Sequence, residues 1–186
     1  MPKQKITKEM VVEAAFALAR SGGLEQVTVT DIAKKLACSV QPIYSYCHNM
    51  DGLRNDVAAR ARQFTQNYVA ARIDRQDPFR STGQAYLQLA KEEPHILKMF
   101  LFQSRTGMAS LDDLYRSEAS PGMAQIISDA LHIGTEQAKQ LHLDMLIYTI
   151  GIGTIYSVAT PGIPAEEIYA RQERAYQIFL KAVKEE

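Results

Sequence analysis

The side chains best suited to chemistry in this 186-residue sequence gather between Thr28 and His48, where hydroxyl, amide and small apolar groups follow one another closely. Hydroxyl and amide groups form hydrogen bonds with phosphate oxygens and with the edges of bases, and small apolar groups contact the methyl group of thymine. The segment therefore favours binding of double-stranded DNA over bond-making chemistry.

Two short helices must position these side chains. The run Thr-Val-Thr-Asp that begins at Thr28 predicts a capping box, in which the threonine hydroxyl accepts from the amide near Asp31 and the Asp31 carboxylate reaches back. A turn of a few residues follows, and Ser39 is placed to cap the next helix, predicted from Val40 to Cys47. Pro42 lies in its first turn, where the missing amide hydrogen removes no helical bond. The pattern predicts a helix-turn-helix.

The second of these helices is the one expected to enter a major groove, with its N-terminal residues toward base edges. Gln41 is the best candidate for an adenine contact, Tyr44 suits a phosphate, and Ile43 is expected to hold the helix to its own core. The complete set of expected DNA contacts is Thr28, Thr30, Lys34, Ser39, Val40, Gln41, Pro42, Tyr44, Ser45, Tyr46 and His48.

The segment TVTDIAKKLACSVQPIYSYCHNMDGL, from Thr28 to Leu53, resembles the DNA-binding region of the tetracycline-repressor (TetR) family. The matching positions are Thr28, Asp31, Ile32, Ala33, Ser39, Ile43, Tyr44 and Leu53. The resemblance covers the first quarter to third of the chain. It implies an all-α protein with an N-terminal three-helix helix-turn-helix domain and a C-terminal helical ligand-binding and dimerisation domain. It also implies a homodimeric repressor that binds a palindromic operator and is released by a small-molecule effector.

Three positions depart from the family pattern: Ala37 replaces the turn glycine, Cys47 a core phenylalanine, and Met50 a phosphate-binding lysine. Ala37 costs about 1 kcal/mol if the turn needs a left-handed conformation. Met50 removes a positive charge and is expected to weaken DNA binding and its salt dependence. Cys38 and Cys47 flank the recognition helix; reduced, small core side chains are the expectation, with a thiol switch as the alternative.

The rest of the chain is predicted to be helical. A long helix capped by Asn49 is expected to connect a DNA-binding domain, residues 1–50, with an effector-binding and dimerisation domain, residues 51–186. Further helices are predicted at 79–93, after Pro94, within 111–131 (one or two), at 136–159 and at 165–186.

The later helices supply candidates for an effector pocket and a dimer interface. Methionine and aromatic side chains adapt to apolar ligands and histidine or glutamine orients them, although ordinary core is the alternative for each residue. The pocket candidates are His95, Met99, Phe100, Phe102, Gln103, Met123, Ile127 and Tyr148. The last two helices carry more apolar surface than one thin domain hides, which favours a subunit interface. Its candidates are Ile152, Tyr156, Ile168, Tyr176 and Phe179.

The composition narrows the functional classes. Twenty-one basic and 21 acidic residues balance, so DNA binding must come from local placement of charge. The N-terminus has no secretory pattern, which indicates a cytoplasmic protein, and the uncharged stretch from Met145 to Ala165 is interrupted by prolines and is expected to be a buried helix instead of a membrane span.

Two alternatives stay open at this point. A small helical enzyme is disfavoured because paired carboxylates, a phosphate-binding glycine loop and a nucleophile-base signature are missing; neither a cofactor nor a metal is expected, since the four histidines have no zinc spacing. A helical ligand-binding dimer without sequence-specific DNA binding is the other alternative, and Met50 is the feature that supports it.

Overall fold

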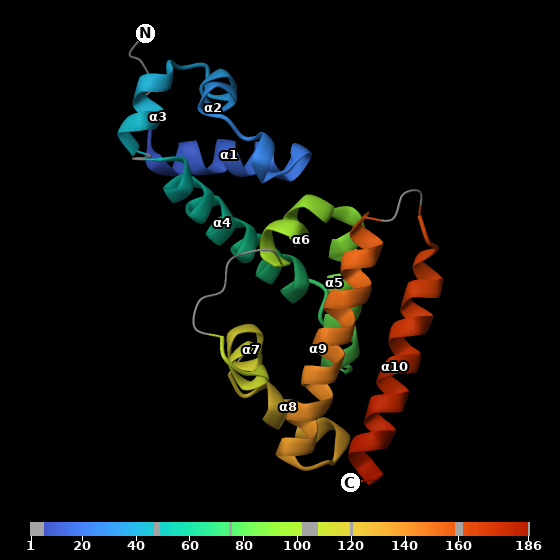
Figure 1. Ribbon diagram of the computed structural model, residues 1–186. Helices are drawn as coiled ribbons and strands as arrows, with labels where there is room; N and C mark the ends of the chain where they lie inside the picture. Colours follow the sequence, from blue (N-terminus) through green and yellow to red (C-terminus); the bar gives the residue numbers. More distant parts are fainter. Residues whose placement is uncertain are drawn as a thin grey trace. The chain divides into compact units, whose positions relative to one another are not determined.

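The computed structural model describes residues 6–46, 49–74, 76–101, 108–119, 121–158 and 162–185. Within these ranges the regular structure consists of helices and contains no strand, so the expected all-α fold is confirmed (Figure 1). The helices are α1 (Lys8–Gly22), α2 (Val29–Lys35), α3 (Val40–Tyr46), α4 (Met50–Ala70), α5 (Pro78–Glu92), α6 (Pro94–Leu101), α7 (Leu111–Glu118), α8 (Met123–Leu131), α9 (Thr135–Val158) and α10 (Ala165–Glu185), with a short 3-10 helix at Leu24–Gln26.

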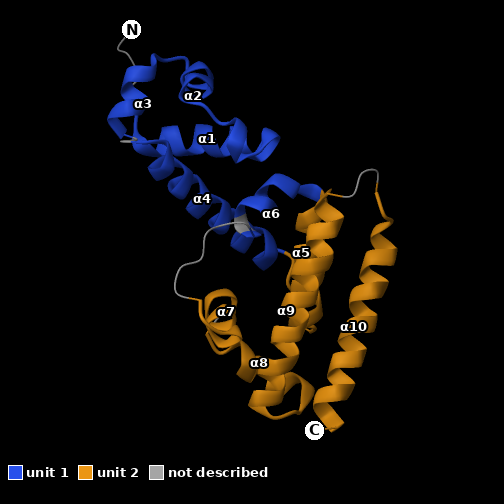
Figure 2. Ribbon diagram, in the orientation of Figure 1, with its two compact units in different colours: residues 1–71, 92–103 blue, residues 72–91, 104–186 orange. Residues whose placement is uncertain are grey.

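The helices divide into two compact units (Figure 2). The first, which we call the N-terminal unit, contains Met1–Ala71 and Glu92–Gln103, and the second, the C-terminal unit, contains Arg72–Lys91 and Ser104–Glu186. The N-terminal unit extends past residue 50 because α4 and α6 share a core with α1, α2 and α3. The functional boundary at residue 50 stays a prediction.

Capping side chains define where the helices of the N-terminal unit begin. The Thr7 hydroxyl accepts a hydrogen bond from the Met10 amide at 3.3 Å, and the Asn49 side chain accepts one from the Gly52 amide at 2.7 Å. Each bond satisfies an amide that the first helical turn leaves without a partner. The predicted cap at Asn49 is therefore confirmed, and α4 starts one residue later.

The core of the N-terminal unit is formed by the apolar faces that the sequence predicts. Ile32 on α2, Ile43 on α3, and Leu53 and Val57 on α4 are all fully or almost fully buried in it. These positions recur at helical spacing, so each helix turns one apolar stripe inward and leaves its polar stripe exposed.

In the C-terminal unit α9 packs along both α8 and α10. Their shared core includes Ile127 of α8, Leu141 of α9, and Tyr176 and Val183 of α10. The helix α9 is the one described helix that is long and apolar enough to cross a membrane by length and composition, and 28% of its most apolar window is buried in the protein. Composition alone does not distinguish such a helix from one whose exposed face is covered by another protein chain.

Candidate DNA-binding surface and ligand cavity

The start of α2 has the predicted threonine cap. The Thr28 hydroxyl oxygen accepts a hydrogen bond from the Asp31 amide at 3.2 Å and donates one to the Asp31 carboxylate at 2.5 Å. The carboxylate thus holds the capping hydroxyl, whereas the sequence predicted that it would reach back to the backbone. The aspartate is one methylene shorter than the glutamate of a full capping box, which explains the difference.

The turn between α2 and α3 has a left-handed residue at Ala37, with φ of +51°. The Cys38 amide donates to the Ala33 carbonyl at 3.0 Å and the Ala37 amide to the Lys34 carbonyl at 3.2 Å, so the turn is closed by backbone bonds. The strain expected from an alanine at the glycine position is therefore present. The predicted cap by Ser39 is not observed, because this exposed side chain forms no hydrogen bond within the described part of the chain.

The helix α3 lies with one side in the core and the other exposed. Ile43 is fully buried, as predicted, and anchors the helix to α1 and α2. Val40, Gln41, Ser45 and Tyr44 are exposed, and Tyr44 shows 60% of its surface. Side chains of these types on an exposed helix face can enter a DNA groove while the N-terminal unit stays folded.

Two predicted contacts on α3 are less accessible than expected. Pro42 is half-buried, and Tyr46 packs its ring against the core of the N-terminal unit. A tyrosine two residues after Tyr44 falls on a different side of a helix, about 200° around, which explains the difference in exposure. The exposed face of α3 is therefore narrower than the sequence suggested.

Exposed groups flank α3 on the preceding helix. Thr28, Thr30, Lys34 and Lys35 are all exposed at or on α2. The Thr28 hydroxyl is already engaged with Asp31, so the Thr30 hydroxyl and two positive charges are available beside the recognition helix. His48 and Cys47 lie outside the described residues. Cys38 is a half-buried free cysteine, and Met50 packs partly against the core. The individual DNA contacts stay predictions.

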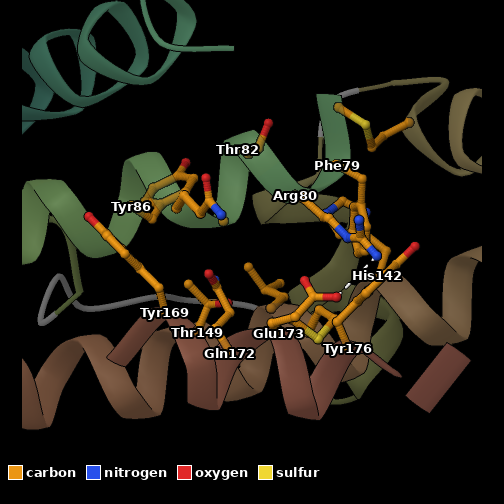
Figure 3. Close-up of a pocket in the computed structure, with 15 residues that line it drawn as sticks. Phe79, Arg80, Thr82, Tyr86, His142, Thr149, Tyr169, Gln172, Glu173 and Tyr176 are labelled. Atoms are coloured by element: carbon orange, nitrogen blue, oxygen red, sulfur yellow. Dashed lines mark hydrogen bonds and ion pairs between the residues drawn. The ribbon is translucent and has the colours of Figure 1, made fainter. Parts of the chain in front are cut away.

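A cavity opens in the C-terminal unit between α5, α8, α9 and α10 (Figure 3). It contains about 670 Å³ of empty space, counted with its open mouth. In Figure 3 the side chains of Tyr86 and Tyr169 lie toward one end, and the group around His142 toward the other. The apolar and aromatic side chains that line it are Phe79, Tyr86, Met123, His142, Met145, Leu146, Tyr169 and Tyr176.

Aromatic rings meet edge to face at one end of the cavity. Phe79 lies 5.6 Å from the His142 ring at an interplanar angle of 85°, and 5.6 Å from the Tyr176 ring. Tyr115 lies behind His142, with its hydroxyl 3.1 Å from the Nδ1 atom. The Phe79–His142 and Tyr115–His142 contacts are edge to face and the Phe79–Tyr176 contact is tilted at 52°, so this wall consists of packed, mostly apolar rings.

Burial keeps the histidine of the cavity neutral. It lowers the pKa of His142 to about 4, because the imidazolium form loses its hydration. Burial also raises the pKa of Tyr115, so its hydroxyl keeps its proton near neutral pH. The pair is therefore uncharged and joined by one hydrogen bond.

The structure divides the predicted pocket residues between the two units. Met123 lines the cavity, Ile127 packs in the core beside it, and Tyr148 packs against that core while its hydroxyl donates to the Arg171 carbonyl at 3.3 Å. His95 and Met99 belong to α6 in the N-terminal unit, and Met99 is buried in its core. Phe102 and Gln103 lie outside the described residues, as does the side chain of Phe100.

Sequence reasoning missed the polar residues of the cavity. The polar lining residues are Arg80, Thr82 and Gln84 of α5, Thr149 of α9, and Gln172 and Glu173 of α10, so α5 meets two helices that lie far from it in the chain. A buried glutamine on an otherwise apolar helix side is a signal in the sequence, because glutamine in a core needs a polar partner.

Most of the predicted interface residues are buried within the protomer itself. Tyr156, Ile168 and Tyr176 are buried within the C-terminal unit and Ile152 and Phe179 are half-buried, so the first three offer almost no surface to a partner. The apolar side chains that are exposed on α9 and α10 are Ile147, Ile155, Val158 and Ile178. The two helices are as predicted, but their exposed faces carry other residues.

Comparisons with known proteins identify the fold. No family model and no curated protein matches the chain. Among solved structures, a TetR-like transcriptional regulator from a Rhodococcus species is 13% identical, with a TM-score of 0.65 over 97% of this chain and 99% of that one. A TetR-family regulator from Haemophilus influenzae is 19% identical, with a TM-score of 0.56 over 91% and 94%.

A third similar structure is a TetR protein from Acinetobacter baumannii in complex with minocycline, which is 10% identical, with a TM-score of 0.57 over 97% of this chain and 92% of that one. The likeness in each case extends over nearly the whole of both chains. At identities this low the comparisons establish only a shared fold. The residues of each site must therefore be inferred from this chain itself.

Proposed function

We propose that this chain, which has the fold of TetR-family transcriptional regulators, is a DNA-binding regulator that represses transcription until a small molecule binds in its C-terminal unit. The observation that carries the proposal is α3 itself, a helix anchored by one buried isoleucine, Ile43, whose other side exposes groups suited to DNA.

The proposed contacts separate into base reading and phosphate binding. Gln41 at the start of α3 reads a base edge, and Val40 contacts a thymine methyl group. Tyr44 and Thr30 bind phosphate oxygens, and Lys34 adds a positive charge. Because the chain carries no net charge, this local cluster supplies the electrostatic attraction.

A second copy of the chain is the proposed partner of the exposed apolar face. Ile147, Gly151, Ile155 and Val158 follow one another at spacings of three and four on α9, and all are exposed. Ile178 adds an exposed apolar group on α10. Contact between copies covers this face, which accounts for the apolar character of α9 in a soluble, cytoplasmic protein.

A two-fold dimer predicts the operator. Two α3 helices related by a two-fold axis read two half-sites about one helical turn of DNA, or a multiple of it, apart, so the operator is palindromic. An effector that binds more tightly to the conformation without DNA lowers DNA affinity by the ratio of its two affinities. Release of the protein from DNA requires only this difference in effector affinity between the two conformations.

Selection of bound sequences from random duplex DNA tests the proposal. We expect a palindrome to be enriched by the full-length protein, and affinity for it to fall at least tenfold in Tyr44→Ala, measured by fluorescence anisotropy at several salt concentrations. Glu25→Ala, at an exposed position outside α2 and α3, is the matched control and retains affinity. Failure to enrich any sequence at low salt favours the alternative of a helical ligand-binding dimer.

A further inference from the structure

The charges that line the cavity compensate one another. The guanidinium of Arg80 forms ion pairs with Asp77 at 3.4 Å and with Glu173 at 3.1 Å, and it lies 4.6 Å from the centre of the Tyr176 ring. Glu173 also accepts a hydrogen bond from Gln177 at 2.7 Å. The one arginine and the one carboxylate of the lining are thus already paired.

A charged ligand therefore has no free counter-ion among the described lining residues. His142 is neutral near pH 7, and the remaining lining groups are tyrosines, amides, two threonines, a glycine and apolar side chains. A carboxylate or an ammonium group that enters such a site loses its hydration without gaining a full ion pair, which disfavours its binding. An uncharged ligand avoids that loss.

Two polar groups of the described lining are available to orient a ligand: the buried Nε atom of Arg80, which has no hydrogen-bond partner among the described residues, and the amide of Gln172. Gln172 is 5% exposed, and its Nε2 atom donates to the Thr149 hydroxyl at 3.1 Å. Its carbonyl oxygen, Oε1, receives no hydrogen bond from the described residues, and the side chain lines the cavity. A ligand that brings a donor therefore completes the hydrogen bonding of this amide.

The Gln172 side chain reaches close to the backbone of α5. A Cβ atom at Gly83 would lie 2.6 Å from Nε2 of Gln172, so the amide would have to shift. The absence of a side chain at Gly83 therefore leaves room for the amide beside α5, where it faces the space between the aromatic side chains (Figure 3).

We propose that the cavity binds an uncharged aromatic compound of one or two fused rings that carries a hydroxyl group. Its rings pack against Phe79, Tyr86 and Tyr176, and its hydroxyl donates a hydrogen bond to Oε1 of Gln172. The regulatory meaning of this binding rests on the proposed function, but the binding itself does not.

Calorimetric titration of the full-length protein with three compounds of one shape tests the charge preference. The probes are 2-naphthol, which is uncharged at pH 7.5, 2-naphthoate, an anion, and 2-naphthylmethylammonium, a cation. We expect 2-naphthol to bind at least tenfold more tightly than either ion. Equal or tighter binding of an ion overturns the proposal.

A change at Glu173 tests the cause of that preference. Glu173→Gln removes one of the two carboxylates that compensate Arg80, so the affinity of 2-naphthoate relative to 2-naphthol is expected to rise at least fivefold. Glu166→Gln, at an exposed position of the same helix outside the cavity, leaves the ratio unchanged. An unchanged ratio in Glu173→Gln contradicts the proposed charge compensation.

A change at Gln172 tests the hydrogen bond. Gln172→Leu keeps the size of the side chain and removes its acceptor, so 2-naphthol is expected to bind about tenfold more weakly while 2-methylnaphthalene, which has no hydroxyl, binds as before. Equal losses for both compounds indicate a structural role for Gln172 and overturn the assignment of the hydroxyl.

Anisotropy measurements with the selected operator separate this proposal from the proposed function. Operator binding without binding of 2-naphthol overturns the ligand class and leaves the regulator intact. Binding of 2-naphthol with the expected charge preference, but without any operator, supports the ligand class and overturns the regulator.

Discussion

His142 couples the stability of the C-terminal unit to pH. Its pKa is about 4 in the folded protein, against about 6.5 in an unfolded chain. Between these values the unfolded chain binds a proton that the folded protein does not, so the contribution of His142 to stability is present above pH 6.5 and is lost as the pH falls toward 4.

Between pH 7.5 and pH 5 the free energy of unfolding of the wild-type protein is expected to fall by about 1–2 kcal/mol more than that of His142→Gln. This difference is smaller than the full linkage value because the ring is only partly buried. Urea unfolding of both proteins at the two pH values measures it. Since the carboxylates titrate alike in both, equal losses would show that the folded histidine is not held neutral.

Glycine at position 83 makes α5 less stable than alanine would, but it leaves room for the Gln172 side chain. Alanine is a better helix former than glycine by about 1 kcal/mol, but a Cβ atom here would meet the Gln172 amide at 2.6 Å. We expect Gly83→Ala to stabilise the Gln172→Ala variant by about 1 kcal/mol and to give little or no gain in the wild-type background. Urea unfolding of the four proteins measures the coupling, and equal gains in both backgrounds would exclude it.

The turn between α2 and α3 carries strain that the helices around it compensate. Ala37 has a φ of +51°, which costs a residue with a Cβ atom about 1–2 kcal/mol relative to glycine. Glycine also makes the unfolded chain more flexible, which offsets part of the gain. We therefore expect Ala37→Gly to stabilise the protein by about 0.5–1 kcal/mol in urea unfolding.

The matched control for the turn is Ala59, an exposed position inside α4. The same substitution there, Ala59→Gly, is expected to destabilise by about 1 kcal/mol, because the helical conformation is ordinary and glycine only adds entropy to the unfolded chain. Destabilisation by both substitutions would contradict a left-handed Ala37.

Substitutions at Gly151 test whether the protein forms the proposed dimer. A Cβ atom at this position meets nothing within 4 Å in the protomer, so a large side chain there leaves the monomer intact. In the proposed dimer the same side chain lies in the interface between Ile147 and Ile155, where it separates the two copies.

Light scattering is expected to give the mass of a monomer for Gly151→Trp and of a dimer for the wild type and Gly151→Ala. Circular dichroism is expected to show the same helical content in all three proteins. Ile155→Asp, at a side chain on the same face that is 59% exposed, is expected to give a monomer as well. Dimers of both Gly151→Trp and Ile155→Asp would place the interface elsewhere.

Local signals made the N-terminal unit predictable from the sequence. The caps at Thr28 and Asn49 and the anchoring role of Ile43 each depend on residues within one or two helical turns, so the sequence contains the information directly. The resemblance over Thr28 to Leu53 added the order of the helices and the expectation of a helix-turn-helix.

The cavity and the exposed apolar face were decided by tertiary structure. Met123 and Gln172 line one cavity with Phe79 only because the chain folds α5, α8, α9 and α10 around it, and nothing local relates residues so far apart. From Met145 to its end α9 carries no charged side chain on any side, so periodicity does not distinguish its buried Tyr156 from its exposed Ile155. Sequence determines which helices form; packing decides which sides of the apolar ones are covered, because burial depends on neighbours that the sequence does not place.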